Sequence, residues 1–267
     1  PKGAAFFVGS TMMKSLVTAI IFLTNNLIAQ SFDFVDQAGI NGLEFDHDHG
    51  GSGEKFYVET MGSGICLLDY DNDNDLDMLL GDYNGFIHYF TNTAGAGNPA
   101  IYALVTPEFF GIDVGADATP LLYDIDGDND LDLIIGGKSG TFSYYNNIGT
   151  TSTSNFILIS SYFGNIDTKR FYDANGNSCP VIIDSSGTTI MYSGAQNGYL
   201  YKFGNIDGNL SGTFSIDSTY LGAWEGIESN ICLADINNDT YLDMLVGNLS
   251  GGVAYYKGYD ATNIKNV

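Results

Sequence analysis

The stretch PLLYDIDGDNDLDLIIG (residues 120–136) joins an apolar strand, an aspartate-rich turn and a second apolar strand that ends in glycine. The same layout recurs in ICLLDYDNDNDLDMLLG (65–81) and ICLADINNDTYLDMLVG (231–247), and in a shorter form in PVIIDSSGTTIMYSG (180–194). A unit that recurs every 50 to 60 residues indicates a repeat architecture rather than a single irregular domain.

Each copy continues in the same way beyond its final glycine. A second glycine follows four positions later, behind Asn or Ser, and such pairs between apolar runs are typical of tight hairpins. An aromatic residue follows five positions further on, and the alternation between the two predicts a third strand with one buried face. The second glycines are Gly85, Gly140, Gly198 and Gly251, and the aromatic residues are Phe90, Tyr145, Phe203 and Tyr256.

A fourth, outer strand can be placed in every unit. These strands are Phe32–Val35, Tyr102–Val105, Phe156–Ser160 and Phe214–Ile216. Four strands per repeat predict an all-β fold, a β-propeller of four four-stranded blades in which the first outer strand completes the last blade. An open fragment of a larger propeller is the alternative. The propeller is expected over residues 30–267, with sequence units at about 31–92, 100–147, 154–205 and 212–258.

The composition excludes several classes of protein. The chain has 32 acidic and 9 basic residues among 267, and its net charge of −23 would repel nucleic acids and anionic membranes. It has 34 glycines and 35 Phe or Tyr residues, which favours short strands and tight turns over a helical bundle.

The aspartate-rich turns predict metal sites. Oxygen-bearing side chains stand at loop positions 1, 3, 5 and 9 of three units: Asp69, Asp71, Asp73 and Asp77; Asp124, Asp126, Asp128 and Asp132; Asp235, Asn237, Asp239 and Asp243. Position 7 varies between Asp75, Asp130 and Tyr241, so we expect its backbone carbonyl to contact the ion. Hard oxygen ligands in a flexible loop suit Ca²⁺ better than Mg²⁺, zinc or copper.

Electrostatics favours the same interpretation. Two like charges about 4 Å apart repel by ~1 kcal/mol in water and by ~4 kcal/mol at an effective dielectric constant of about 20. Clustered carboxylates would therefore strain each loop unless a cation joins them. The sequence predicts three calcium sites and none in the third unit, where Ser and Gly replace the acids after Asp184.

The N-terminus carries an export pattern. Residues 13–29 have a basic start, a short apolar run and a small-residue end, which is typical of a secretory signal peptide cleaved before Gln30. The apolar run is too short to span a membrane, so we expect a secreted or cell-surface protein. Residues 1–12 precede this pattern, and we expect them to be an upstream remnant outside the fold.

These motifs resemble FG-GAP/VCBS repeats, the calcium-binding blades also found in integrin α propellers. The resemblance covers about residues 31–258, and the stretch Phe34–Asp77 also resembles the opening of the ASPIC/UnbV and cartilage-acidic-protein group. The signal and the Asn/Gly/Tyr-rich repeats are similar to secreted proteins of Bacteroidetes-type bacteria. The resemblance implies calcium-binding propeller blades, although the third unit and the low number of blades depart from the family pattern.

The expected function is a non-enzymatic, calcium-binding extracellular module for protein or glycan binding. The connections between units carry aromatics, including the single tryptophan, Trp224, and these would either bind a partner or wedge blades together. The alternative is an exported polysaccharide lyase or hydrolase, whose best candidates lie in DHDHGGSGE (46–54). Cys66 and Cys232 would form either a disulfide or two buried thiols.

Overall fold

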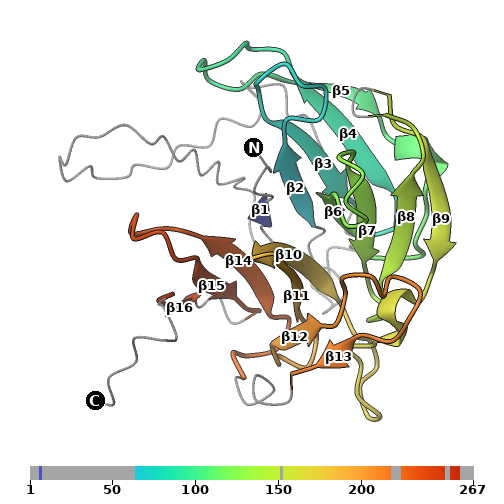
Figure 1. Cartoon of the computed structure of the whole chain (residues 1–267), viewed down its shortest axis with the longest axis vertical. Coiled ribbons are helices and arrows are strands. Elements are labelled where there is room, and N and C mark those ends of the chain that lie inside the picture. The colour runs from blue at the N-terminus through green and yellow to red at the C-terminus, as the bar shows by residue number, and fades with distance from the viewer. Residues whose placement is uncertain (1–5, 8–63, 151–152, 218–223, 250–252, 259–267) are drawn as a thin grey trace, which may run out of the picture.

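The fold is an all-β propeller of four antiparallel blades arranged around a common axis (Figure 1). The computed structural model describes residues 6–7, 64–150, 153–217, 224–249 and 253–258. Blade 1 contains β2 (Ile65–Leu68), β3 (Asp77–Gly81), β4 (Ile87–Asn92) and β5 (Tyr102–Thr106). Blade 2 contains β6 (Thr119–Tyr123), β7 (Asp132–Gly136), β8 (Ser143–Asn147) and β9 (Phe156–Ser160).

The other two blades follow the same strand order. Blade 3 contains β10 (Cys179–Ser185), β11 (Thr188–Gly194), β12 (Tyr201–Gly204) and β13 (Ser215–Ile216). Blade 4 contains β14 (Asn230–Ala234), β15 (Asp243–Gly247) and β16 (Val253–Tyr256). The helical elements of the described residues are two single 3-10 turns, η2 (Phe109–Gly111) and η3 (Phe163–Asn165). The predicted fold class is confirmed.

The sequence units are offset from the blades by one strand. The outer strand that opens the sequence unit at about 100–147 is β5, and it pairs with β4 of blade 1. The strands that open the next two sequence units, β9 and β13, pair in the same way with β8 of blade 2 and β12 of blade 3. By the same offset, the first predicted outer strand, Phe32–Val35, would belong to blade 4, as the ring-closure prediction requires. That segment lies outside the described residues, and the three described strands of blade 4 end with β16.

Phe6 and Phe7 correct one expectation. They form β1, which pairs antiparallel with β2 and makes the sheet of blade 1 five-stranded. β1 also lies beside β14, between blades 1 and 4 (Figure 1). The prediction that residues 1–12 take no part in the fold is therefore wrong for these two residues, because an inner strand offers an open edge that a short extended segment can pair with.

Repeated backbone contacts join each blade to the next. The amide of Ala118 donates to Asp82 O at 3.1 Å, and that of Ser178 donates to Gly137 O at 3.0 Å. The glycine that ends the second strand lies against the carbonyl of the same residue whose amide makes this contact: a Cβ on Gly136 would come within 2.3 Å of Ser178 O. Gly81 and Gly194 lie similarly close to backbone atoms of the next blade, so the close approach of neighbouring blades requires the terminal glycines of blades 1 to 3, whereas a Cβ on Gly247 of blade 4 would meet nothing within 4 Å.

The core lies between the blades. One apolar cluster joins blades 2, 3 and 4, with fully buried Phe142 and Phe203 in edge-to-face contact at 6.0 Å between ring centroids. A second joins blades 1 and 2. A third cluster, which includes Met78 and Phe90, lies within blade 1. All five residues of β3 and all five of β7 are buried, so both faces of the second strand are covered in these two blades.

Successive turns lie at opposite ends of the blades. The Asp-rich loops join first to second strands, while the hairpins at Gly85, Gly140 and Gly198 have positive φ and contact the connections between blades. The amide of Val114, for example, donates to Gly85 O at 3.1 Å. The predicted separation of the acidic loops from the connecting segments thus follows from the observed strand order.

Candidate metal centres

The loop of blade 1 is wound tightly by its own carboxylates. Asp71 Oδ1 accepts from the Asp73 amide at 3.2 Å, and Asp73 Oδ1 accepts from the Asp75 amide at 2.9 Å. Asn72 and Asn74, between these positions, have φ of 63° and 70°, a conformation that Asn tolerates better than most residues. Alternation between acids and residues that accept positive φ turns the acids toward a common centre.

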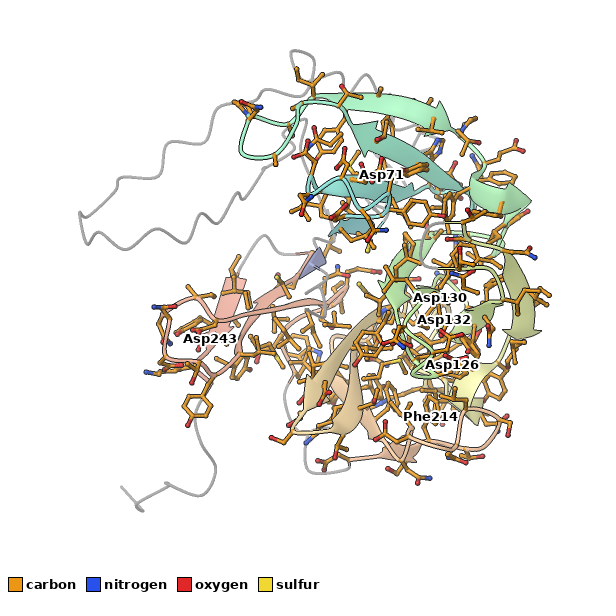
Figure 2. The ribbon with its side chains drawn as sticks, turned by 45° about the horizontal axis from the view of Figure 1, so that its top comes forward. Asp71, Asp126, Asp130, Asp132, Phe214 and Asp243 are labelled. Carbon is orange, nitrogen blue, oxygen red and sulfur yellow. The ribbon has the colours of Figure 1, made fainter. Side chains whose placement is uncertain are left out.

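The loop of blade 2 has the same winding. Asp126 Oδ1 accepts from the Asp128 amide at 3.2 Å, and Asp128 Oδ1 accepts from the Asp130 amide at 3.0 Å. The positive φ values fall on Gly127 and Asn129, at 84° and 76°. Two different sequences therefore give one backbone path. Figure 2 shows Asp71 and the Asp126 group on neighbouring blades, with Asp243 on a separate blade.

Positions 1, 3 and 5 come together in both loops. In each loop, one carboxylate oxygen from each of the three aspartates lies within 4.8 Å of the others. Asp69 Oδ1, Asp75 Oδ2 and Asp130 Oδ1 are buried and accept no hydrogen bond. Carboxylate oxygens that converge, together with buried ones that accept no hydrogen bond, are suitable ligands for a hard cation that binds 6–8 oxygens. The residues present therefore fit Ca²⁺.

Position 7 departs from expectation in one respect. We expected its backbone carbonyl to matter and its side chain to be free to vary. The side chains of Asp75 and Asp130 are instead buried, with 6% of each residue's surface exposed, and they face the loop. In these two loops position 7 places a further buried carboxylate in the loop, outside the three whose oxygens lie within 4.8 Å of one another, whereas Tyr241 of the blade 4 loop is exposed and adds none.

Position 9 braces the loop against the third strand. Asp77 is fully buried and accepts from the backbone amides of Asn92 at 2.8 Å and Tyr70 at 3.3 Å. Asp132 is also fully buried, and it accepts from the amides of Asn147 and Ile125. Neither aspartate belongs to the groups within 4.8 Å. Position 9 thus connects the loop to the third strand, in addition to its predicted role as a ligand.

Burial and mutual repulsion act on the ionisation of these groups. Burial raises the pKa of Asp132 to about 7, and the nearby charges of Asp126 and Asp128 act in the same direction. Burial also raises the pKa values of Asp77 and Asp130. The loops therefore hold more negative charge than their surroundings favour, which a bound cation would offset.

The loop of blade 4 differs from the other two. Asn237, at position 3, donates through Nδ2 to Asp243 Oδ2 at 3.1 Å, and Asp235 accepts from the amides of Asp239 and Thr240. Lys257 Nζ lies 3.1 Å from Asp239 Oδ2. The third predicted site thus has one carboxylate fewer at position 3 and an internal cation beside position 5.

The equivalent turn of blade 3 is a two-residue hairpin. Ser185 pairs with Thr188, and the residues between them, Ser186 and Gly187, have φ of 56° and 83°. Positive φ at both central residues is the mark of a type I′ turn. The nine-position loop of the other blades is therefore replaced, as the shorter sequence predicted.

Comparison with protein families, with curated proteins and with solved structures finds no match to this chain. The resemblance to FG-GAP/VCBS repeats therefore stays a prediction. None of the helical turns in the described residues has the length or apolar character needed to cross a membrane.

Sequence reasoning missed a recurring asparagine. Two positions beyond the aromatic of the third strand stand Asn92, Asn147 and Asn205. Besides the backbone contact to position 9, Asn92 Oδ1 accepts from the amides of Ala94 and Ile101, and Asn147 Oδ1 from those of Gly149 and Asn155. Asn92 and Asn147 link the acidic loop to the outer strand, and aligning the units at the third-strand aromatic would have found all three asparagines.

A polar group near the blade starts was also missed. Asp117, Asn177 and Glu228 occupy the same position before the inner strands of blades 2, 3 and 4, each with positive φ. Asn177 Nδ2 donates to Glu228 Oε2 at 2.7 Å, and Lys138 Nζ lies 3.9 Å from Asp117 Oδ2. Burial raises the pKa of Asp117 to about 6, with Glu228 and Asp82 adding to the shift and Lys138 opposing it.

Three further predictions concern the alternative enzyme site, the cysteines and the aromatic residues of the connections. The DHDHGGSGE segment lies outside the described residues. No disulfide joins Cys66, Cys179 and Cys232, so the Cys66–Cys232 disulfide is not formed, and Cys232 instead lies near Cys179 of blade 3. Among the connection aromatics, Phe109 and Phe163 are buried wedges, whereas Phe110 and Trp224 are half exposed or more.

Proposed function

We propose that this chain is a calcium-stabilised extracellular binding module built on a four-bladed propeller. The observation that carries the proposal is the convergence of three carboxylates within 4.8 Å in the loops of both blade 1 and blade 2, with buried oxygens that accept no hydrogen bond. The acidic loops lie at the blade ends opposite the connections, which leaves the connections available for a partner.

Calcium would stabilise the blades in this molecule. Each ion would hold its loop in the observed conformation. The aspartate at position 9 and its partner, Asn92 or Asn147, would connect that loop to the third and outer strands. The export pattern at 13–29 and the resemblance to FG-GAP/VCBS repeats support secretion and calcium binding. The enzyme alternative is favoured by no contact among the described residues, since its candidates lie outside them.

Calcium should raise the melting temperature of the purified chain, and a chelator should lower it. Two sites occupied at 100 times their Kd contribute about 5 kcal/mol, which corresponds to a rise of roughly 10 °C or more for a chain of this size. Scanning calorimetry in excess Ca²⁺, in excess Mg²⁺ and in chelator measures this effect. An identical midpoint in all three conditions would overturn the proposal.

A variant locates the effect. Asp126→Ala removes one of the converging oxygens of blade 2 and should abolish one calcium-binding event in a calorimetric titration while the site of blade 1 remains. Glu108→Ala, at an exposed acid in the connection after β5, is the matched control and should leave the titration unchanged.

A further inference from the structure

The connection between blades 2 and 3 contains a six-residue insertion. The amides of Val114, Thr168 and Glu225 donate to the second glycines of the three hairpins, Gly85, Gly140 and Gly198, and so mark one equivalent position. In two connections, the residue two positions before the inner strand follows three positions after this donor: Asp117 after Val114, and Glu228 after Glu225. It is nine positions from Thr168 to Asn177, so residues 169–174 are extra.

The insertion presents two aromatic side chains to solvent. Phe171 and Tyr172 have 91% and 93% of their surface exposed, and their rings touch only each other among the aromatics of the described residues, at 4.9 Å and 88°. Exposed aromatics that stand together on a soluble domain indicate a binding surface, since their exposure is unfavourable in the free protein.

The turn that carries these rings is held in place. The Asp173 amide donates to Arg170 O at 2.9 Å, and the Arg170 amide donates to Asp173 Oδ2 at 2.8 Å. Asn197 Nδ2 donates to Asp173 Oδ2 at 2.8 Å and to Thr168 O at 3.0 Å. The Arg170 guanidinium lies 3.6 Å from the centre of the Tyr199 ring. A pre-ordered tip loses little conformational entropy when a ligand binds.

Trp224 extends the same surface. Its Nε1 donates to Asn197 O at 2.9 Å, so the indole is attached to the residue that anchors the insertion, and 58% of its surface is exposed. Tyr199 forms an isolated β-bridge with Trp224. The aromatic tip surface is defined here as Phe171, Tyr172 and Trp224, with Arg170, Asp173 and Asn197 beside them.

Charge narrows the class of ligand. The chain carries a net charge of −23, which repels a polyanion, whereas the insertion holds Lys169 and Arg170 against one acid, Asp173, which disfavours a polycation at the tip. An uncharged ligand meets neither repulsion. The face of an aromatic ring attracts partly positive C–H groups, and the surrounding amide, carboxylate and guanidinium groups can pair with hydroxyls. Pyranose rings offer both kinds of group.

We propose that the aromatic tip surface binds a neutral polysaccharide, with pyranose rings stacked on Phe171, Tyr172 and Trp224. The proposal rests on the binding function proposed above and names its site and its ligand class. It uses the end of the propeller opposite the acidic loops, so calcium supports the scaffold and does not contact the glycan.

The test uses Trp224 fluorescence, because this is the one tryptophan in the sequence and it belongs to the surface. The full chain is titrated in Ca²⁺ with neutral β-glucan, mannan and xylan oligosaccharides. At least one should give a saturable change, and Phe171→Ala with Tyr172→Ala should weaken binding about tenfold or more. Leu104→Ala with Leu158→Ala, which removes two half-exposed apolar side chains from the outer strands of blades 1 and 2, should not change binding.

The outcomes separate this proposal from the calcium proposal. Melting temperatures in Ca²⁺ and in chelator are measured for every variant, and the tip variants should match the unmodified chain because their side chains are exposed. Glycan binding without a calcium effect would overturn the calcium proposal alone. Absence of binding to all of the glycans, undiminished binding by the tip variant, or binding to zwitterionic lipid vesicles or to a protein in place of the glycans would overturn the inference.

Discussion

Lys257 shows how one side chain can separate otherwise similar loops. Its Nζ lies 3.1 Å from Asp239 Oδ2, where a cation bound to the blade 4 loop would need that carboxylate. Hydrogen bonding to the Tyr241 amide and the nearby Lys257 lower the pKa of Asp239, so its charge is already balanced within the protein. We therefore expect the acidic loop of blade 4 (loop 4) to bind calcium more weakly than the acidic loops of blades 1 and 2 (loops 1 and 2).

Lys257→Met should strengthen calcium binding to loop 4 several-fold, because it frees Asp239 and removes a competing charge. The change is best measured by calorimetric titration in a chain that also carries Asp71→Asn and Asp126→Asn, so that loop 4 dominates the signal. Lys202→Met, which breaks the ion pair of Lys202 with Asp217 at 3.4 Å on blade 3, is the matched control. Equal affinities in the two variants would contradict this prediction.

Asp117 makes stability depend on pH through its burial. Its pKa of about 6 in the folded chain lies above the value of about 3.9 expected when unfolded. The folded state therefore holds this proton between about pH 4 and pH 6 while the unfolded state does not. The free energy of unfolding therefore falls as pH rises through this window, by about 3 kcal/mol for a difference of two pKa units.

Asp117→Asn should remove this loss. The variant should melt at a higher temperature than the unmodified chain at pH 7.5 in saturating Ca²⁺, and the difference should disappear near pH 4. Glu108→Gln changes an exposed carboxylate in the same connection and should show no such convergence. A constant difference between Asp117→Asn and the unmodified chain across the pH range would show that burial of the charge is not the cause.

The converging residues of the acidic loops were predictable from sequence, because side chains at positions 1, 3 and 5 of a tight turn face the same centre. The hydrogen bonds of position 9 were not. Asp77 and Asp132 are predicted as further ligands, and the structure shows in addition that they accept from the amides of Asn92 and Asn147, 15 residues away. A contact between the loop and the far end of the third strand depends on blade geometry, which spacing within the loop does not contain.

At the scale of the strand, the glycines that end the second strands of blades 1 to 3 lie against the backbone of the next blade. A Cβ on Gly194 would lie 1.8 Å from Ser229 O and 2.5 Å from its carbonyl carbon. Both atoms belong to the backbone of the next blade and cannot rotate away. Substitution there must therefore push blades 3 and 4 apart.

Gly194→Ala should lower the free energy of unfolding by about 3 kcal/mol or more, because overpacking against backbone is not relieved by a change of rotamer. Urea unfolding followed by circular dichroism measures the loss. Gly97→Ala, where a Cβ meets nothing within 4 Å, should cost only about 1 kcal/mol for its positive φ of 80°. Similar losses in both variants would contradict the role assigned to blade contact.

The turns divide in the same way between what sequence predicts and what it does not. The short DSSG turn of blade 3 predicted that its acidic loop is missing, and the hairpin at Ser186–Gly187 follows from its length alone. The hairpin glycines Gly85 and Gly140 were predicted for their positive φ. Their second role, close approach to Gly115 and Gly176 in the connections, depends on packing between blades.

For the whole molecule, the repeat period predicted the architecture, because units that share one strand pattern can bury their faces only against one another. The insertion at 169–174 was overlooked, since it lies between units where the strands give no register. β1 was also missed. If the chain is cleaved before Gln30 as the export pattern predicts, β1 is removed with the signal and the inner edge of blade 1 becomes free.

Ring closure is the remaining prediction at this scale. β16 exposes Val253, Tyr255 and Tyr256, of which Val253 has 71% of its surface exposed, and it has no fourth strand among the described residues. The other three blades each cover this position with an outer strand. The segment Phe32–Val35 has the alternation of such a strand, and pairing with β16 would join the start of the propeller to its end.

A chain that begins at Gln37 should therefore melt at a lower temperature than one that begins at Gln30, by several degrees, because it leaves blade 4 with an uncovered edge and an open ring. Removing residues 259–267 from the C-terminus is the control, since no strand is predicted there. The shorter chain should also form dimers through the free edge of β16 as its concentration rises, which sedimentation velocity would detect. Unchanged melting and a monomer at every concentration would favour an open propeller whose last blade needs no closing strand.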